Sequence, residues 1–462
     1  MKGHGLMSRL PRPVRAGLFI VLMVALGAIY WQAAARHSRE VNTDRESTDQ
    51  GAYLNAARKM RETGHAHVGD RNRMPIYPFL QSWQIRPGLS EDAIFERGKR
   101  LNIVLSLALL AGIGAILMRS FGPLTSLNLL LVMAFTVFVF KAAYVQCELL
   151  YYTLSFCGFL LMCSCLREPE WRKGLLAGAV LGLAHLTKAA ILPALALYLA
   201  IGALSGLAAW LMASRRRREA REPGRTTAPW RPILAAAMTA LGFLVVVYPY
   251  ISTSKRVFGR YFYNVNSTFY MWYDTHEQVM TGTRVHGDRE GWPEMPADQI
   301  PSLRRYLREH TSGQIVRRVT DGLAALHDNA ARSFGFYKYV LMYAGLALVV
   351  TLWDPAGAAA LLRSHRAPVA FAVCLFAGYA VLYAWISATN SGMTRLTLQQ
   401  FTPLMYGLSW VAFSDKLRPP AMRLGGRTVK LTDAFNVVVL VMISLEIPLV
   451  VTSRVVAIYG GS

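Results

Sequence analysis

Residues 47–80 read STDQGAYLNAARKMRETGHAHVGDRNRMPIYPFL and follow the first hydrophobic segment of the chain. Ser47 and Gln50 stand three residues apart, which is the spacing of a capping box and predicts the start of a helix. Gly64 is a natural stop for that helix. Between these signals an apolar stripe recurs at helical spacing, through Tyr53, Ala56, Ala57 and Met60.

Asp49 falls in the first turn of this expected helix. Unpaired backbone N–H groups at a helix start favour an ionised carboxylate. Such a carboxylate beside a membrane suits a general base or a metal ligand. The alternative is an aspartate that only stabilises the helix start, and residues 47–80 alone leave both interpretations open.

Hydrophobic segments dominate the rest of the chain. Of its 462 residues, 53% are hydrophobic and 17% are charged. Many apolar runs approach the ~20 residues needed to cross a bilayer. We therefore predict an all-α polytopic membrane protein, with residues 1–462 forming a single membrane-embedded domain. About eleven transmembrane helices are expected, near 16–35, 101–118, 124–140, 147–166, 174–187, 190–212, 232–251, 336–353, 368–387, 396–413 and 433–452.

The distribution of basic residues predicts the orientation. A formal net charge of +23 is explained in a membrane protein by cytoplasmic loops and anionic lipid, so we expect no nucleic-acid partner. The short basic segments 167–173, 214–225 and 414–430 are expected inside, with 214–231 as a cytoplasmic linker. This places the protein in the cell (inner) membrane, with its N-terminus cytoplasmic and its C-terminus extracytoplasmic.

Two large extracytoplasmic loops carry amphipathic helices in this prediction. The first long loop, 36–100, holds the Asp49 helix and a second helix from Ser90 to Arg100. The second long loop, 252–335, contains another capping-box pattern at Thr311 and Gln314. An apolar stripe follows it and predicts an amphipathic helix that lies along the outer surface or packs on the bundle, through Ile315, Val319, Leu323 and Leu326.

Aromatic residues are concentrated in the second long loop, where residues 258–277 read FGRYFYNVNSTFYMWYDTHE. Rings alternating with polar side chains can bind a sugar by stacking or lie at the membrane interface as an aromatic belt. The sequence leaves both interpretations open. The histidines of the two loops, His276 and His286 among them, form no ligand set that we can assign.

Charged residues near the predicted spans are informative because charge in a bilayer is costly and usually functional. Glu148 opens the fourth span, Lys188 breaks the apolar block 174–212 together with a nearby proline, and Arg395 opens the tenth span. Each is expected on the same membrane face as Asp49. Arg73, in the first long loop, can also reach a phosphate. Together they predict a site that pairs carboxylates with phosphate-binding cations, whereas each alone can be a snorkelling interface residue.

At these residues the chain resembles the membrane-embedded glycosyltransferases of the GT-C superfamily, in particular the branch of protein O-mannosyltransferases and lipid A aminoarabinose transferases. The common acidic pair of the first loop reads Asp49-Gln50 here, so the second acid is missing. The resemblance covers most of the chain in order and is carried by DQGAYLNAARKMRETG (49–64), RNRMPIYPFL (71–80), ELLYYTLSF (148–156), GLLAGAVLGLAHLTKAAILP (174–193) and TRLTLQQFTPL (394–404).

The resemblance implies an enzyme that moves a sugar, with inversion, from a polyprenyl-phosphate carrier to a lipid, glycan or protein acceptor at the outer face. Asp49 matches the family's catalytic aspartate, which takes the acceptor's proton as general base. Glu148 would orient the acceptor or share a divalent metal ion with Asp49, the one cofactor that we expect. Lys188 and Arg395 would hold the carrier phosphate, and Arg73 is a further candidate for that role.

A secondary transporter or lipid flippase is the alternative, since such proteins also use ionisable residues and broken helices. Transporter sites lie near the bilayer midplane and are often formed by paired repeats. The candidate residues of this chain are instead expected at one face, next to two large loops. A non-catalytic membrane scaffold would leave that clustering unexplained.

Overall fold

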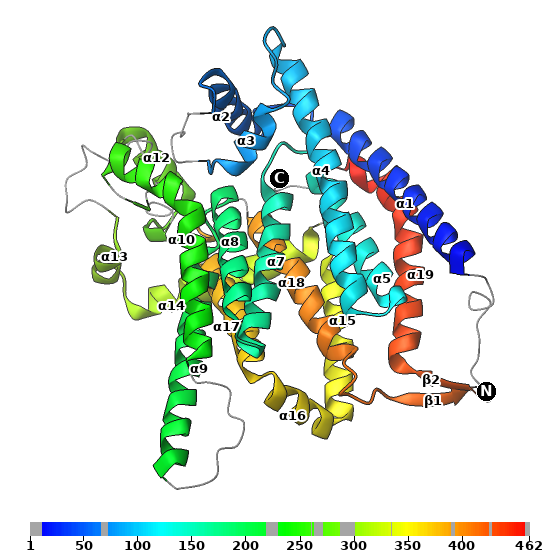
Figure 1. The fold of residues 1–462 in the computed structure, drawn as a ribbon. Coiled ribbons are helices and arrows are strands. Elements are labelled where there is room, and N and C mark those ends of the chain that lie inside the picture. The colour runs from blue at the N-terminus through cyan, green and yellow to red at the C-terminus, as the bar shows by residue number, and fades with distance from the viewer. Residues whose placement is uncertain are drawn as a thin grey trace.

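The chain folds into a bundle of long helices (Figure 1), and the computed structural model describes residues 12–65, 73–218, 230–259, 261–262, 271–286, 301–333, 335–389, 393–424 and 427–457. The helices are α1 (Arg12–Glu40), α2 (Gln50–Glu62), α3 (Ile76–Ser82), α4 (Glu91–Ser120), α5 (Pro123–Met133), α6 (Val139–Ala142), α7 (Glu148–Arg167), α8 (Trp171–Thr187), α9 (Leu192–Arg218), α10 (Arg231–Phe258), α12 (His276–His286), α13 (Leu303–Glu309), α14 (Ser312–Arg332), α15 (Tyr337–Trp353), α16 (Pro355–Ser364), α17 (Arg366–Ile386), α18 (Met393–Ala412) and α19 (Leu431–Thr452). A π-helical turn (Ala134–Phe138) joins α5 to α6, a 3₁₀ turn (Arg454–Val456) follows α19, and β1 (Ala421–Leu424) pairs antiparallel with β2 (Arg427–Lys430).

The predicted all-α polytopic membrane architecture is confirmed. Within the described ranges, eight helices are long and apolar enough to cross a membrane, or nine if the bent pair α14–α15 forms one span. The other predicted spans also fall on helices, namely α8, α15 and α18. Because α8 and α15 have only 17 residues each, the count of eleven stays a prediction.

Glycines let α8 pack closely against α10. Gly174, Gly178 and Gly182 recur every four residues along α8, and each faces α10. A Cβ atom on Gly178 would lie 2.1 Å from the carbonyl oxygen of Thr239, so no larger residue fits there. Small residues of this kind drive helix association in membranes, where backbones can then approach closely. The packing fixes the position of the α8 C-terminus, at which Lys188 follows.

The predicted break in the apolar block 174–212 is confirmed. Helix α8 ends at Thr187, and Lys188 adopts an extended backbone with φ −156° and ψ 129°. Helix α9 then begins at Leu192, with Pro193 in its first turn. A backbone N–H in the first turn has no acceptor within the helix, so a proline there removes no hydrogen bond.

The predicted start of α2 is wrong by two residues. Ser47 does not cap the helix, because its Oγ donates to the carbonyl of Asp44 at 2.8 Å. The helix begins at Gln50, and Asp49 is the residue immediately before the first turn, with no side-chain capping hydrogen bond within the described residues. Its end agrees with the prediction, since Gly64 has the left-handed φ of 60° that glycine accommodates.

The separate helix expected at 90–100 is also wrong. Ser90 caps a helix, as its Oγ accepts the N–H of Ala93 at 3.3 Å, but that helix is the 30-residue α4 and includes the predicted span at 101–118. The charged first turns of α4 contain no residue that ends a helix. The backbone hydrogen bonds therefore continue from these turns into the predicted span at 101–118.

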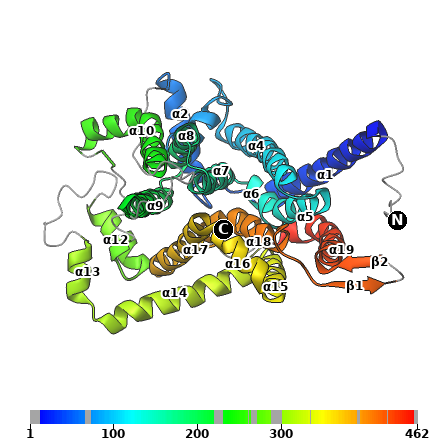
Figure 2. The ribbon, with the colours of Figure 1, turned by 60° about the horizontal axis from the view of Figure 1, so that its bottom comes forward.

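The predicted surface helix of the second long loop is α14, which runs across the bundle in Figure 2 and meets α15 at 105°. Its capping box is present: Thr311 N–H donates to Gln314 Oε1 at 2.8 Å, and Gln314 N–H donates to Thr311 Oγ1 at 3.4 Å. Within the predicted apolar stripe, Leu326 is buried, whereas Leu323 is 41% exposed. Gly322 takes its place, against the carbonyl of Ala384 in α17.

The helices define two ends of the bundle. Figure 1 shows α2 and α3 at one end, and α16 with the β1–β2 hairpin at the other. The second end carries the short basic segments 167–173 and 414–430, whereas 219–229 lies outside the described residues. By the positive-inside rule, the end with α16 is expected in the cytoplasm.

Reporter fusions test this orientation. A reporter fused after Gly64, between α2 and α3, should be active outside, and one fused after Ser364, at the end of α16, should be active inside. Gly64 follows the end of α2 and Ser364 is the last residue of α16, so the two positions lie at opposite ends of the bundle. Reporters on the same side would contradict the orientation.

Candidate active site

Gln50 connects three parts of the chain near the candidate site. Its side chain is fully buried and exchanges two hydrogen bonds of 2.8 Å with the amide of Asn42. Gln50 Oε1 also accepts the N–H of Val145 at 2.9 Å, and Asn42 Nδ2 donates to the carbonyl of Ala143 at 2.8 Å. This amide pair holds together the segment after α1, the start of α2 and the turn between α6 and α7. The side chain of Gln50 is therefore not available to complete a capping box with Ser47.

Asp49, the predicted base, forms an ion pair with Arg73. The Asp49 Oδ1 and Arg73 Nη2 atoms are 2.7 Å apart, and the side chains are 41% and 19% exposed. The guanidinium also lies over the ring of Tyr53, with its Cζ 5.3 Å from the ring centroid. Arg73 thus contacts α2 twice although it lies in the segment that precedes α3, and Asp49 remains accessible to solvent.

Tyr53 links this ion pair to the start of α7. Its ring is buried against Tyr77, 5.2 Å away in an edge-to-face arrangement, and its hydroxyl is 3.0 Å from the Sγ of Cys147. Burial raises the pKa of Tyr53 well above its ordinary value, so the hydroxyl stays protonated. Cys147 directly precedes Glu148 in the chain.

Glu148 and Lys188 form the second ion pair. Lys188 Nζ is 3.2 Å from Glu148 Oε1; the carboxylate side chain is 4% exposed and the lysine 27%. Glu148 is the first residue of α7, where the unpaired N–H groups of a helix start favour a negative charge. Lys188 approaches it from the break between α8 and α9.

The same break is hydrogen-bonded to α17. Tyr379 donates its hydroxyl to the carbonyl of Ala190 at 2.7 Å, and Tyr383 donates to Gln399 of α18 at 2.6 Å. Arg395 lies in the first turn of α18, four residues before Gln399. Its side chain is outside the described part of the structure, so its role stays a prediction.

The structure therefore brings four predicted site residues together. Asp49 with Arg73 and Glu148 with Lys188 make two ion pairs, and Tyr53 and Cys147 connect them. No protein-family model, curated protein or solved structure matches this chain. A functional assignment thus depends on this geometry and on the resemblance of the sequence motifs.

Sequence reasoning missed the structural role of Gln50 and the linking role of Tyr53 and Cys147. Tyr53 stood out only as a member of an apolar stripe, and Cys147 only as the first residue of the predicted span 147–166. Gln50 was noted where the GT-C pattern has a second acid. A polar side chain on the apolar face of a short helix was the one signal that it has a buried partner.

A metal site is not completed by these residues. In the described ranges, no three His, Cys, Asp or Glu side chains are grouped so that they could hold a metal ion. Asp49 and Glu148 each have a cationic partner, Arg73 and Lys188, that balances the charge a metal would neutralise. The metal ion expected at Asp49 and Glu148 stays a prediction, and no step below involves it.

Gln50→Glu tests the amide pair. A carboxylate keeps the acceptor for Val145 but loses the amide that donates to Asn42, and Asn42 cannot rotate without losing its bond to Ala143. Leaving a buried acceptor unsatisfied should lower the free energy of unfolding by about 1–3 kcal/mol, measured by thermal unfolding.

Asn55→Asp is the matched control for that variant. It adds the same charge to the exposed face of α2, where Asn55 Oδ1 accepts from Arg45 at 3.1 Å. Its stability should stay within about 0.5 kcal/mol of the wild type. Equal stability of both variants and the wild type would show that the amide pair is dispensable.

Proposed function

We propose that this protein is a glycosyltransferase that moves a sugar from a polyprenyl-phosphate carrier to an acceptor hydroxyl, with Asp49 as general base. One observation carries the proposal: two carboxylates and two cations from four separate segments lie in one connected group at one end of a helix bundle. The resemblance to GT-C enzymes at the same residues supports it.

The proposed reaction is a single displacement at the anomeric carbon. The Asp49 carboxylate accepts the proton of the acceptor hydroxyl as its oxygen attacks that carbon. The bond from the anomeric carbon to the phosphate oxygen breaks, and its electron pair stays on the leaving phosphate. Attack and departure on opposite sides invert the configuration of the sugar.

Arg73 and Lys188 supply positive charge for the carrier phosphate. Both are paired with carboxylates in this structure, at 2.7 Å and 3.2 Å. A phosphate competes for those cations through charge-assisted hydrogen bonds. When it attracts Arg73, Asp49 is released from its ion pair as the donor arrives. The donor would thereby activate the base, and proton transfer without a bound donor would be disfavoured.

The accessible position of Asp49 favours transfer over transport. A transporter is expected to hold its ionisable groups near the midplane, whereas α2 and α3 form the end of the bundle in Figure 1. A long isoprenoid chain could lie between helices while its phosphate reaches this end.

Asp49→Asn tests the base. The amide keeps the size of the side chain but cannot accept the acceptor's proton, and loss of a general base typically lowers the rate ~10²–10⁴-fold. We expect a folded protein that transfers almost no sugar from a labelled polyprenyl-phosphate donor, with thermal unfolding changed only slightly.

Asp44→Asn is the control for the base. Asp44 is exposed, and its Oδ1 accepts only the nearby N–H of Glu46, at 2.8 Å, within the described residues. Its transfer rate should stay close to that of the wild type. Wild-type turnover by Asp49→Asn would refute the assignment, and an inactive Asp44→Asn beside it would move the base to Asp44. Lipid translocation without transfer would favour a flippase.

Lys188→Gln tests phosphate binding. Loss of a charge-assisted contact to a phosphate costs about 1.5–3 kcal/mol, which raises the apparent KM for the donor about 10–100-fold. The matched control is Lys338→Gln, because Lys338 also pairs with a buried glutamate, Glu446, but on α15 and α19. It should change stability and leave donor KM as it is. Equal KM in both variants would remove Lys188 from the donor site.

A further inference from the structure

A second polar site lies in the second long loop. A pocket of about 660 Å³ is formed by α12, α13 and the residues before each, and six of its lining residues carry the argument: Trp272, Tyr273, Asp274, Glu277, Arg305 and Tyr306. Figure 2 shows α12 and α13 at the edge of the molecule near α14 and α17, whereas α2 lies beyond α8. The pocket is therefore distinct from the ion pairs of Asp49 and Glu148.

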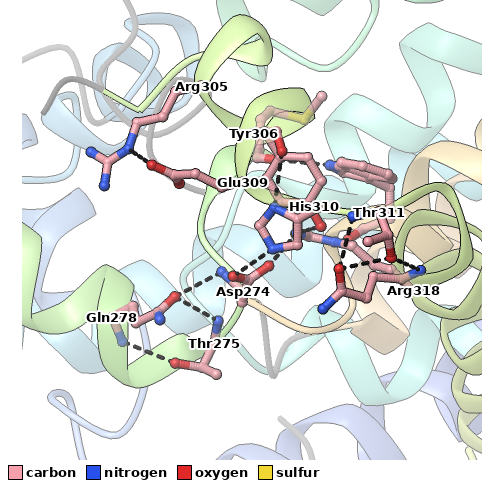
Figure 3. A network of polar contacts seen from close by, with 12 residues as sticks. Asp274, Thr275, Gln278, Arg305, Tyr306, Glu309, His310, Thr311 and Arg318 are labelled. Atoms are coloured by element: carbon pink, nitrogen blue, oxygen red, sulfur yellow. Dashed lines mark hydrogen bonds and ion pairs between the residues drawn. The ribbon is translucent and has the colours of Figure 1, made fainter. Parts of the chain in front are cut away.

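Arg318 of α14 forms the support beneath this pocket (Figure 3). Its side chain is only 6% exposed; Nη1 donates to Asp274 Oδ1 at 3.3 Å and to the Tyr306 hydroxyl at 3.0 Å. Its Nε donates to the carbonyl of Trp385 at 2.9 Å, and the guanidinium lies 4.5 Å from the Trp385 ring centroid. A buried arginine held by four contacts fixes the pocket wall to α17.

His310 holds the other oxygen of Asp274. Its Nε2 is 3.1 Å from Asp274 Oδ2, its Nδ1 is 3.0 Å from the carbonyl of Tyr306, and its ring stacks on the Tyr306 ring at 3.9 Å. Both neighbours of the ring are hydrogen-bond acceptors. Asp274 is thus a fixed group with its charge shared between His310 and Arg318.

Two further contacts attach the pocket to the end of α17. Trp385 Nε1 donates to the carbonyl of Met271 at 2.7 Å, and His276 Nδ1 is 3.1 Å from the carbonyl of Thr389. His276, which the sequence left without a partner, therefore helps to hold α12. A pocket fixed in this way loses little conformational freedom when a ligand binds.

The lining combines aromatic rings with three carboxylates and one arginine, and with Asp274 and Glu309 paired its excess negative charge is that of Glu277. Arg305 Nε pairs with Glu309 Oε1 at 2.8 Å, and the charge of Asp274 is shared as described. Trp272 is half-buried at the pocket, and its ring centroid lies 6.2 Å from that of Tyr306. The C–H face of a pyranose can stack on such aromatic rings. Its hydroxyls can hydrogen-bond to side chains that offer both donors and acceptors. The paired charges of the lining would do less to neutralise the charge of a strongly charged ligand.

From these contacts we infer that the pocket binds a neutral glycan. Trp272 supplies the stacking surface, and Asp274, Glu277 and Arg305 supply hydrogen bonds to the sugar hydroxyls. Residues 271–277, at the end of the aromatic stretch 258–277, are then more than a membrane-interface belt; residues 260 and 263–270 of that stretch lie outside the described ranges. This site does not require the Asp49 chemistry.

Glycan binding is tested by NMR saturation transfer on the full chain in lipid nanodiscs, with neutral glucose and mannose tetrasaccharides as probes. Sugar-headed detergents are avoided because they would compete for the pocket. Trp272→Ala should weaken binding about tenfold, the effect of a lost aromatic contact. Trp353→Ala removes an equally large ring that is 66% exposed on α15 and should change nothing.

Two more variants make the outcome decisive. Thr281→Trp places a large ring at an exposed position of α12 that lines the pocket, so it should abolish binding even if Trp272→Ala folds poorly. Asp49→Asn should bind the probes like the wild type, so failure of sugar transfer would leave this site intact. The inference is overturned if the wild type binds no neutral tetrasaccharide, if it binds only charged sugars, or if Thr281→Trp binds normally.

Discussion

The reciprocal amide pair of Gln50 and Asn42 is the constraint on which the geometry of the first long loop depends. It is buried and joins two neighbouring stretches, after α1 and at the start of α2, to the distant turn between α6 and α7. Because Gln50 opens α2, the same pair places Asp49 one residue before it, toward Arg73. A neutral amide at this position can donate and accept at once, and a carboxylate cannot.

The glycine face of α8 is the corresponding constraint on the other ion pair. Close packing on α10 leaves α8 no room to shift. The helix ends just before Lys188, whose side chain reaches Glu148. Helix packing in the bundle therefore positions Lys188, while the buried amide pair positions Asp49. The two arrangements meet at Tyr53 and Cys147.

Features that depend on sequence neighbours could be predicted from the sequence. The apolar spans, the capping box at Thr311 and the break at Lys188 are of this kind. The start of α2 could not, because the partner that engages Gln50 lies 95 residues away at Val145. The same holds for the cluster around Asp274, whose partners His310 and Arg318 are 36 and 44 residues distant. Asp49 was identifiable from its place at a predicted helix start, and Glu148 and Lys188 because charge beside an apolar span is unusual. Their pairing required the fold.

The length of α8 has a consequence for the surrounding lipid. Its 17 residues rise only about 25 Å at ~1.5 Å per residue, while a hydrocarbon core is ~30 Å thick. A helix this short crosses the core only where the bilayer thins or where its end lies below the headgroups. Lys188 follows that end, so the local bilayer would be drawn toward the ion pair with Glu148. Membrane thickness then becomes a variable that sets how easily a lipid phosphate reaches the lysine.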